Sequence, residues 1–152
     1  MKLILCRNKS YPSKLIQKVT WSRWSHVGIV DGDVVIEAIG IPPLSLILVL
    51  LGLKRNHISL GGVVETPIKD FINRYKTHRV VYIEGSIEKA RSCIGMEFDA
   101  WGILGIKVKR QIHCSNKMFC SKLVAYAAYE YRDRFIYTAT VQKILEISRD
   151  EP

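Results

Sequence analysis

The sequence lacks the long apolar run that a membrane-spanning helix requires. Its longest uninterrupted apolar stretch, residues 44–53, has ten residues, whereas crossing a bilayer takes about 20. The N-terminus has only four apolar residues, 3–6, before it turns polar at Arg7, too few for the apolar core of a secretory signal peptide. We therefore expect no transmembrane helix, and the cytoplasm is the default compartment. Release by lysis or carriage in a phage particle fits the same sequence.

Several chemical signatures are also missing. The chain has no glycine-rich phosphate loop, no dinucleotide-binding fingerprint and no serine-centred nucleophile elbow. It has four cysteines, which in a reducing compartment are free thiols rather than a disulfide framework. Zinc sites usually carry Cys-x₂₋₄-Cys pairs, which this chain lacks. We therefore expect no cofactor and no metal. A zinc site built from His26, His113, Cys114 and Cys120 is an alternative with unusual spacing.

The composition is that of a folded protein with a strongly basic surface. Hydrophobic residues make up 48% of the 152-residue chain, enough for one domain, residues 1–152, with a real core. The formal net charge is +9, which favours encounter with anionic partners such as nucleic acid, acidic polymers or a membrane surface. The basic residues are scattered and form no dense tract. We therefore expect no specific binding of nucleic acid.

The hydrophobic pattern predicts a mixed α+β domain, with an antiparallel sheet packed against helices. An apolar insertion at about 39–60 interrupts the order, and residues 41–53 within it are candidates for contact with a membrane or an anionic surface. Strands are expected at 2–6, 25–30, 33–38, 61–66 and 79–83, and helices at 13–21, 67–75, 86–94, 119–131 and 138–147.

The clearest local signal is a β-hairpin. The dipeptide Asp31-Gly32, typical of a two-residue hairpin loop, joins two strand-like runs. With these residues as the loop, the numbers of two residues paired across the hairpin add up to 63. His26 then lies directly opposite Glu37. Because side chains alternate along a strand, His26, Gly28 and Glu37 share one face. The other face is apolar and carries Val27, Ile29, Val34 and Ile36.

A histidine beside a carboxylate is the arrangement of a catalytic base and the group that orients it. The carboxylate fixes the tautomer of the imidazole and stabilises the imidazolium. The alternative is a cross-strand salt bridge on a solvated face. The hairpin alone leaves both interpretations of His26 and Glu37 open.

Cys120 is the candidate nucleophile, because it lies at the start of the strongest predicted helix. A thiol in the first turn of a helix feels the positive end of the helix dipole, which favours the thiolate. Cys114, which precedes the helix, is a rival without this dipole. An inert core cysteine is the alternative for Cys120, and we expect Cys6 and Cys93 to be buried residues of that kind.

Together these segments resemble the circularly permuted, NlpC-type papain-like cysteine amidases and peptidases, specifically the YiiX-like branch. The resemblance covers nearly the whole chain in the right order. It is carried by Ser25-His-Val-Gly-Ile-Val30, Val35-Ile-Glu-Ala38, Gly61-Gly-Val63, Gly95-Met-Glu-Phe-Asp99 and Phe119-Cys-Ser-Lys-Leu-Val124.

The resemblance implies a papain-like fold with the nucleophile at a helix N-terminus and Cys120, His26 and Glu37 as catalytic residues. It implies hydrolysis of an amide or isopeptide bond through a thioester acyl-enzyme. The chain departs from the family at Phe98, where the family has Tyr, and at the apolar insertion. Asp99 is then interpreted as a structural residue.

The substrate stays open at this point. A peptide, an acyl group and a peptidoglycan-like cell-wall peptide are all candidates. One alternative is a thiol acyltransferase or lipid-directed esterase on the same fold, similar to the lecithin–retinol acyltransferase relatives. Those relatives use a second histidine where this chain has Glu37. The other alternative is a non-catalytic binding protein.

Overall fold

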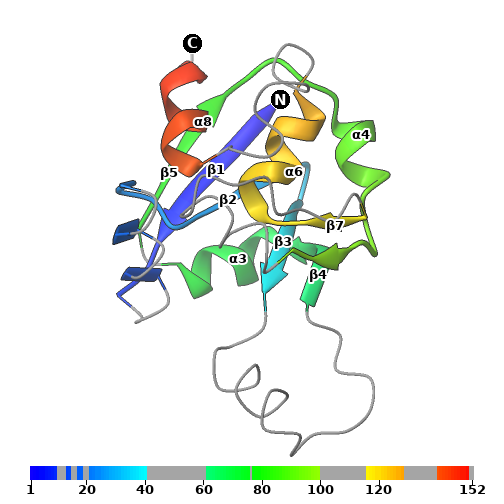
Figure 1. The fold of residues 1–152 in the computed structure, drawn as a ribbon, viewed down its shortest axis with the longest axis horizontal. Helices are drawn as coiled ribbons and strands as arrows, with labels where there is room; N and C mark the ends of the chain where they lie inside the picture. Colours follow the sequence, from blue (N-terminus) through cyan, green and yellow to red (C-terminus); the bar gives the residue numbers. More distant parts are fainter. Residues whose placement is uncertain are drawn as a thin grey trace, which may run out of the picture.

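In the part of the chain that the structure describes, seven strands form one sheet, which is antiparallel except for its last pair (Figure 1). They are β1 (Lys2–Arg7), β2 (His26–Asp31), β3 (Val34–Gly40), β4 (Gly61–Pro67), β5 (Thr77–Tyr82), β6 (Glu97–Phe98) and β7 (Lys117–Met118). Their order is β5-β1-β2-β3-β4-β6-β7. The structure, a computed structural model, describes residues 1–9, 13–14, 17–18, 21–40, 61–75, 77–99, 116–128 and 140–150.

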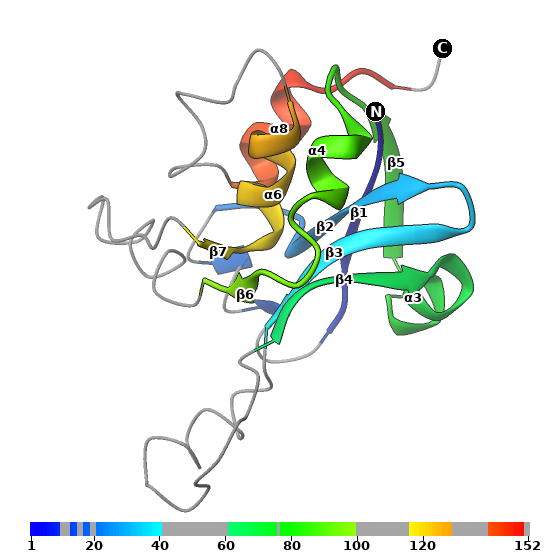
Figure 2. The same ribbon diagram turned by 90° about the vertical axis from the view of Figure 1, so that its right-hand side faces the viewer.

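Helices cover both faces of the sheet (Figure 2). On one face lie α4 (Ile87–Arg91), α6 (Cys120–Ala127) and α8 (Val141–Ile147), and on the other lies α3 (Ile68–Arg74). The larger core includes Leu3, Leu5 and Val27, which point toward α6 and α8. Their neighbours along the strands, Ile4 and Cys6, belong to a second, smaller core closed by Phe71 of α3 and by Val30 and Val35. Because side chains alternate along a β-strand, the strands contribute buried residues to two cores, one on each face of the sheet.

The expected mixed α+β architecture with a mostly antiparallel sheet is confirmed. The strongest predicted helix, residues 119–131, is shorter than expected. Helix α6 begins at Cys120 and ends at Ala127, and Ala128 has extended backbone angles. The carbonyl of Ala127 accepts a hydrogen bond from the backbone N–H of Ser86, 2.8 Å away, so the end of α6 is tied to the start of α4. This contact between distant residues leaves no trace in the local hydrophobic pattern.

The hairpin is present, but the predicted register is wrong by two residues. Asp31 pairs with Val34 and Val30 with Val35, so the loop is Gly32-Asp33 rather than Asp31-Gly32. Only Gly32 of these loop residues has a positive φ, +58°. Such a turn needs glycine at its first loop position, whereas the expected turn would also need a positive φ at Asp31. Because the shift is even, every side chain keeps its predicted face.

The predicted insertion at about 39–60 begins later than expected. Strand β3 continues through Ile39 and Gly40, which pair with Gly62 and Gly61 of β4. Residues 41–60, and with them the candidate surface-binding segment 41–53, lie outside the described residues. Within the described ranges, no helix has the length and hydrophobicity that crossing a membrane requires.

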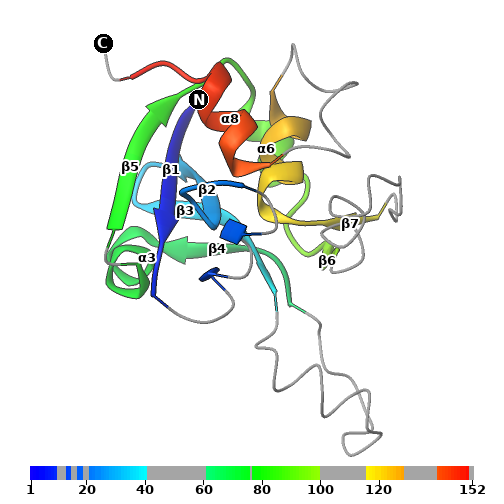
Figure 3. The same cartoon turned by 60° about the vertical axis from the view of Figure 1, so that its left-hand side comes forward.

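The edge strand β5 is tied to both ends of the described chain. The backbone groups of Tyr82 and Arg149 exchange two hydrogen bonds of 2.8 Å, and the N-terminal amine of Met1 donates to the carbonyl of Ile83 at 2.6 Å. Figure 3 shows β5 at the side of the sheet next to β1, with α8 packed nearby. The segment after α8 thus extends the sheet by one bridge.

A buried ion pair holds the first turn of α6 in place. The Nζ atom of Lys122 lies 3.2 Å from Asp99 Oδ2 and donates to the carbonyl of Lys117 at 2.6 Å, and both charged side chains are almost fully buried. The backbone N–H of Asp99 donates to the carbonyl of Met118. The segment after β6 is therefore fastened to β7 and to the helix that begins at Cys120. This agrees with the structural role expected of Asp99.

Replacing Lys122 with Met tests this ion pair. The change leaves the Asp99 carboxylate buried without its cation, which typically costs about 3–5 kcal/mol. Urea denaturation should show a loss of that size in the free energy of unfolding. Glu97→Gln, which breaks the exposed Lys117–Glu97 pair, is the matched control and should cost less than about 1 kcal/mol. Equal losses in the two variants would contradict the buried anchor.

Candidate active site

His26 and Glu37 are in direct contact, and the contact is buried. The Nε2 atom of His26 lies 2.7 Å from Glu37 Oε2, and the two side chains are 12% and 0% exposed. Continuing the observed register, Glu37 lies opposite Gly28, so it reaches His26 along the diagonal of the hairpin. Because the pair is buried, the alternative of a salt bridge on a solvated face is wrong.

The carboxylate of Glu37 has two further partners from other elements. At its second oxygen, Oε1, the Thr66 hydroxyl of β4 donates at 2.7 Å and Arg74 Nη1 of α3 donates at 2.9 Å. Burial by itself raises the pKa of Glu37, but the hydrogen bonds and positive charges around it outweigh burial and lower the pKa. Glu37 is therefore a carboxylate, held by three donors.

Two aromatic rings pack on His26 from α3 and the residue after it. The ring centroids of Tyr75 and Phe71 lie 5.3 and 6.1 Å from that of His26, in stacked orientations. A Cβ atom added at Gly28 would lie 2.3 Å from a methyl carbon of Val35 and 3.4 Å from a ring carbon of Phe71. Gly28 thus lets Phe71 pack closely enough to support the imidazole. These rings and the bond to Glu37 fix the orientation of His26.

The half-buried thiol of Cys120 lies at the first position of α6, preceded by Phe119 as the N-cap. It hydrogen-bonds to the side chain of His26 and accepts backbone hydrogen bonds from Val27 and Ser121. Burial raises the pKa of the thiol, but His26 and these backbone donors outweigh burial and lower it. Nε2 of His26 contacts Glu37, so Nδ1 is the ring nitrogen available to Cys120. The structure therefore brings all three predicted residues together.

The electrostatics of the site favour an ion pair between Cys120 and His26. Burial lowers the pKa of His26, but its hydrogen bonds with Cys120 and Glu37 outweigh burial and raise the pKa to about 9. A lowered pKa at the thiol and a raised pKa at the imidazole both favour the pair of a thiolate and an imidazolium over the neutral pair.

The other cysteines differ from Cys120 as expected where they are described. Cys6 and Cys93 are fully buried, and burial raises the pKa of both thiols. The negative charges of Cys120 and Glu37 raise the pKa of Cys6 further. The rival nucleophile Cys114, and His113 with it, lie outside the described residues. Within the described ranges, no three His, Cys, Asp or Glu side chains are grouped to hold a metal ion.

Four residues of the site were not predicted from the sequence. They are Thr66 and Arg74, which bind Glu37, and Phe71 and Tyr75, which stack on His26. Thr66 lies directly opposite Val35, on the face of β3 that carries Glu37. The sequence gives no clear signal for this, because Glu65 on the same strand is also polar and is exposed, whereas Thr66 is buried. The other three lie in or just after a short helix whose pattern does not mark the face that meets the sheet.

The ion pair predicts that Cys120 is alkylated rapidly at mildly acidic pH. At about pH 6.5 an ordinary cysteine with a pKa of about 8.5 is only about 1% thiolate. In His26→Ala, the Cys120 thiolate loses the interaction that stabilises it most. Its rate of reaction with iodoacetamide at that pH should therefore fall on the order of 10- to 100-fold. The rate is measured by mass spectrometry of the intact protein, with His78→Ala as the control on an exposed strand position. Equal rates in wild type and His26→Ala would exclude the activated thiolate.

The pKa of His26 reports on its carboxylate partner. Glu37→Gln removes the negative charge and leaves only a weaker, neutral acceptor, so the pKa of His26 should fall from about 9 toward 6.5. Two-dimensional NMR of the imidazole C–H signals across a pH titration measures this shift. Glu65→Gln, on an exposed position of the neighbouring strand β4, should leave the titration unchanged. A His26 pKa that is the same in Glu37→Gln as in wild type would show that the carboxylate does not stabilise the imidazolium.

Comparison with known proteins gives this site no assigned counterpart. No family model, curated protein or solved structure matches the chain. The site itself combines a thiol at a helix start, a histidine beside it, and a buried carboxylate with three donors.

Proposed function

We propose that this protein is a cysteine hydrolase that cleaves an amide or isopeptide bond through a thioester intermediate. Cys120 is the nucleophile, His26 the acid and base, and Glu37 the group that orients His26. The observation that best supports this proposal is a chain of contacts: the buried carboxylate of Glu37 contacts His26, and His26 contacts Cys120. Cys120 is the only half-buried thiol among the described cysteines. Peptides, including cell-wall peptides, are the substrate class that we propose.

Acylation follows from the positions of these groups. The thiolate of Cys120 attacks the carbonyl carbon, a C–S bond forms and the carbonyl π electrons move to oxygen. The backbone N–H of Cys120, in the first turn of α6, has no acceptor within the helix and can donate to this oxyanion. As the oxyanion collapses, the C–N bond breaks, and the imidazolium of His26 gives its proton to the leaving amine.

Hydrolysis restores the starting state. The neutral imidazole of His26 takes a proton from water, and the oxygen of that water attacks the thioester carbonyl. The C–S bond then breaks, Cys120 leaves as the thiolate, and the acyl group is released as an acid. Glu37 keeps the imidazole oriented and stabilises its charged form through both steps.

The arrangement of the chain supports a place among the permuted NlpC-type papain-like enzymes. In this chain the histidine and the carboxylate come first, on adjacent strands, and the cysteine follows at a helix start. The helix lies on the face of the sheet opposite α3. The motifs around His26, Glu37 and Cys120 resemble those of the YiiX-like branch. We propose this fold and family for the protein on that basis.

A substrate screen with trapped intermediates tests the proposed activity. Wild-type protein incubated with peptides, peptidoglycan fragments and acyl esters should form an acyl adduct on Cys120, visible by mass spectrometry. Cys120→Ser should lower turnover of the best substrate on the order of 10³-fold or more. Cys93→Ala, which changes a buried cysteine outside the site, should retain turnover. Turnover that survives in Cys120→Ser would contradict the proposed nucleophile.

The pH dependence of kcat/KM should have two limbs. Below the lowered pKa of Cys120 the thiolate is protonated and the rate falls. Above about 9, His26 loses the proton that the leaving amine needs, and the rate falls again. In Glu37→Gln the alkaline limb should move to lower pH, because the pKa of His26 decreases. An alkaline limb that stays in place in this variant would argue against His26 as the proton donor.

A further inference from the structure

A basic pocket lies beside the catalytic residues. It has a volume of about 540 Å³ and is lined by Arg7, Asn8, Lys9, Lys14, Gln17, Arg74 and Thr77. Among the described residues that line it, four are cationic and none is Asp or Glu. The volume is in the range of small-molecule sites and is much larger than a single phosphate or carboxylate. It therefore accommodates an anionic group together with part of the molecule that carries it.

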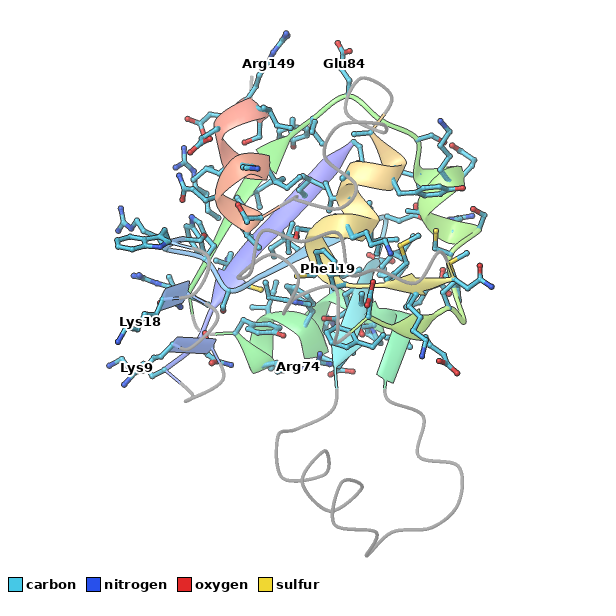
Figure 4. All side chains as sticks on the ribbon, in the orientation of Figure 1. Lys9, Lys18, Arg74, Glu84, Phe119 and Arg149 are labelled. Atoms are coloured by element: carbon cyan, nitrogen blue, oxygen red, sulfur yellow. The ribbon has the colours of Figure 1, made fainter. Side chains whose placement is uncertain are left out.

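The pocket and the catalytic site share a wall. Arg74 lines the pocket, and its Nη1 atom donates to Glu37 at 2.9 Å. Arg7 lines it as well, and Arg7 directly follows Cys6, which pairs with His26 across strands β1 and β2. Figure 4 shows Lys9 and Arg74 on the same lower side of the molecule, with Phe119, the residue before Cys120, above Arg74. Arg74 thus contacts both the pocket and the Glu37 carboxylate.

The positive charge of the pocket is only partly compensated. Exposed basic residues elsewhere, Arg79 and Arg91, pair with Asp150 and Asp31. Among the described residues, Lys9 and Lys14 have no acidic partner of this kind. Like charges gathered in a concave site repel one another and raise the local concentration of anions. An anionic ligand would relieve this repulsion.

Two of the cations are already held in position. The guanidinium of Arg7 lies 5.8 Å from the centre of the Trp24 ring, and that of Arg74 lies 5.9 Å from the centre of the Tyr75 ring. Arginine held in this way binds phosphate or carboxylate with little further ordering, because its donors form a rigid fork. Lys9 and Lys14 add mobile point charges at the same site.

We propose that this pocket binds an anionic group, a phosphate or carboxylate, of the substrate whose acyl bond Cys120 attacks. The inference rests on the proposed hydrolase function and narrows it to acyl substrates that carry a negative charge. Binding in the pocket places the anionic end of the substrate against Arg74, whose guanidinium contacts the Glu37 carboxylate of the catalytic site.

Anion binding is tested first, without catalysis. Cys120→Ser is titrated with inorganic pyrophosphate by isothermal titration calorimetry at low ionic strength. One site is expected, and adding Lys9→Glu or Lys14→Glu should weaken binding at least about tenfold. The matched control is Lys2→Glu, the same charge change at the other end of β1, with an expected effect below about twofold. Equal weakening in all three variants would mean that only the overall charge of the protein attracts anions. That result would overturn the proposal that the pocket is an anion-binding site.

The link to Cys120 is tested with two alkylating reagents of different charge. Iodoacetate is anionic and iodoacetamide is neutral. In both reactions the Cys120 thiolate attacks the CH₂ carbon of the reagent and iodide leaves. Lys9→Glu and Lys14→Glu should lower the iodoacetate rate about fivefold or more relative to iodoacetamide, whereas Lys2→Glu should not. The iodoacetamide rate should remain the same in all variants, because the thiolate is intact.

The two experiments separate the pocket from the proposed function. If pyrophosphate binding is lost in the pocket variants but the ratio of alkylation rates does not change, the pocket binds anions without serving the thiol, and its role in the substrate site is overturned. If neither reagent labels wild-type Cys120 rapidly, the hydrolase proposal fails, while calorimetry still decides whether the anion pocket exists.

Discussion

The burial of one carboxylate organises the site. An unpaired charge in a protein interior costs several kcal/mol, so the fully buried Glu37 requires partners. It takes them from three elements: His26 of β2, Thr66 of β4 and Arg74 of α3. Strand β3 is thereby fixed to its neighbours on both sides and to the helix beneath. The orientation of His26 is a consequence of satisfying Glu37.

The thiol is positioned from the opposite side of the sheet by a second buried ion pair. Lys122 is two residues after Cys120, and its contacts with Asp99 and the carbonyl of Lys117 hold the first turn of α6 against the end of the sheet. Cys120 and His26 therefore belong to separately anchored elements that meet at one point. Anchoring of both partners in advance is what the proposed acyl transfer would require.

The sequence predicted the parts of the site that depend on local patterns. Alternation along the hairpin placed His26 and Glu37 on one face, and helix signals placed Cys120 at a helix start. The register failed because the rule for Asp-Gly loops competes with the preference for glycine at the first loop position, and Gly32 occupies that position. Thr66 and Arg74 are 29 and 37 residues from Glu37. Contacts over such separations depend on how β4 and α3 pack, which hydrophobic periodicity does not encode.

The bridge between Tyr82 and Arg149 has a consequence for how copies of this protein behave toward one another. A sheet with free edges exposes unpaired backbone groups that can recruit another chain and start aggregation. Here one outer strand, β5, is partly covered by the bridge and carries the exposed side chains of His78 and Arg79. The other outer strand, β7, has only two residues. Both borders of the sheet are thus poor templates for edge-to-edge association.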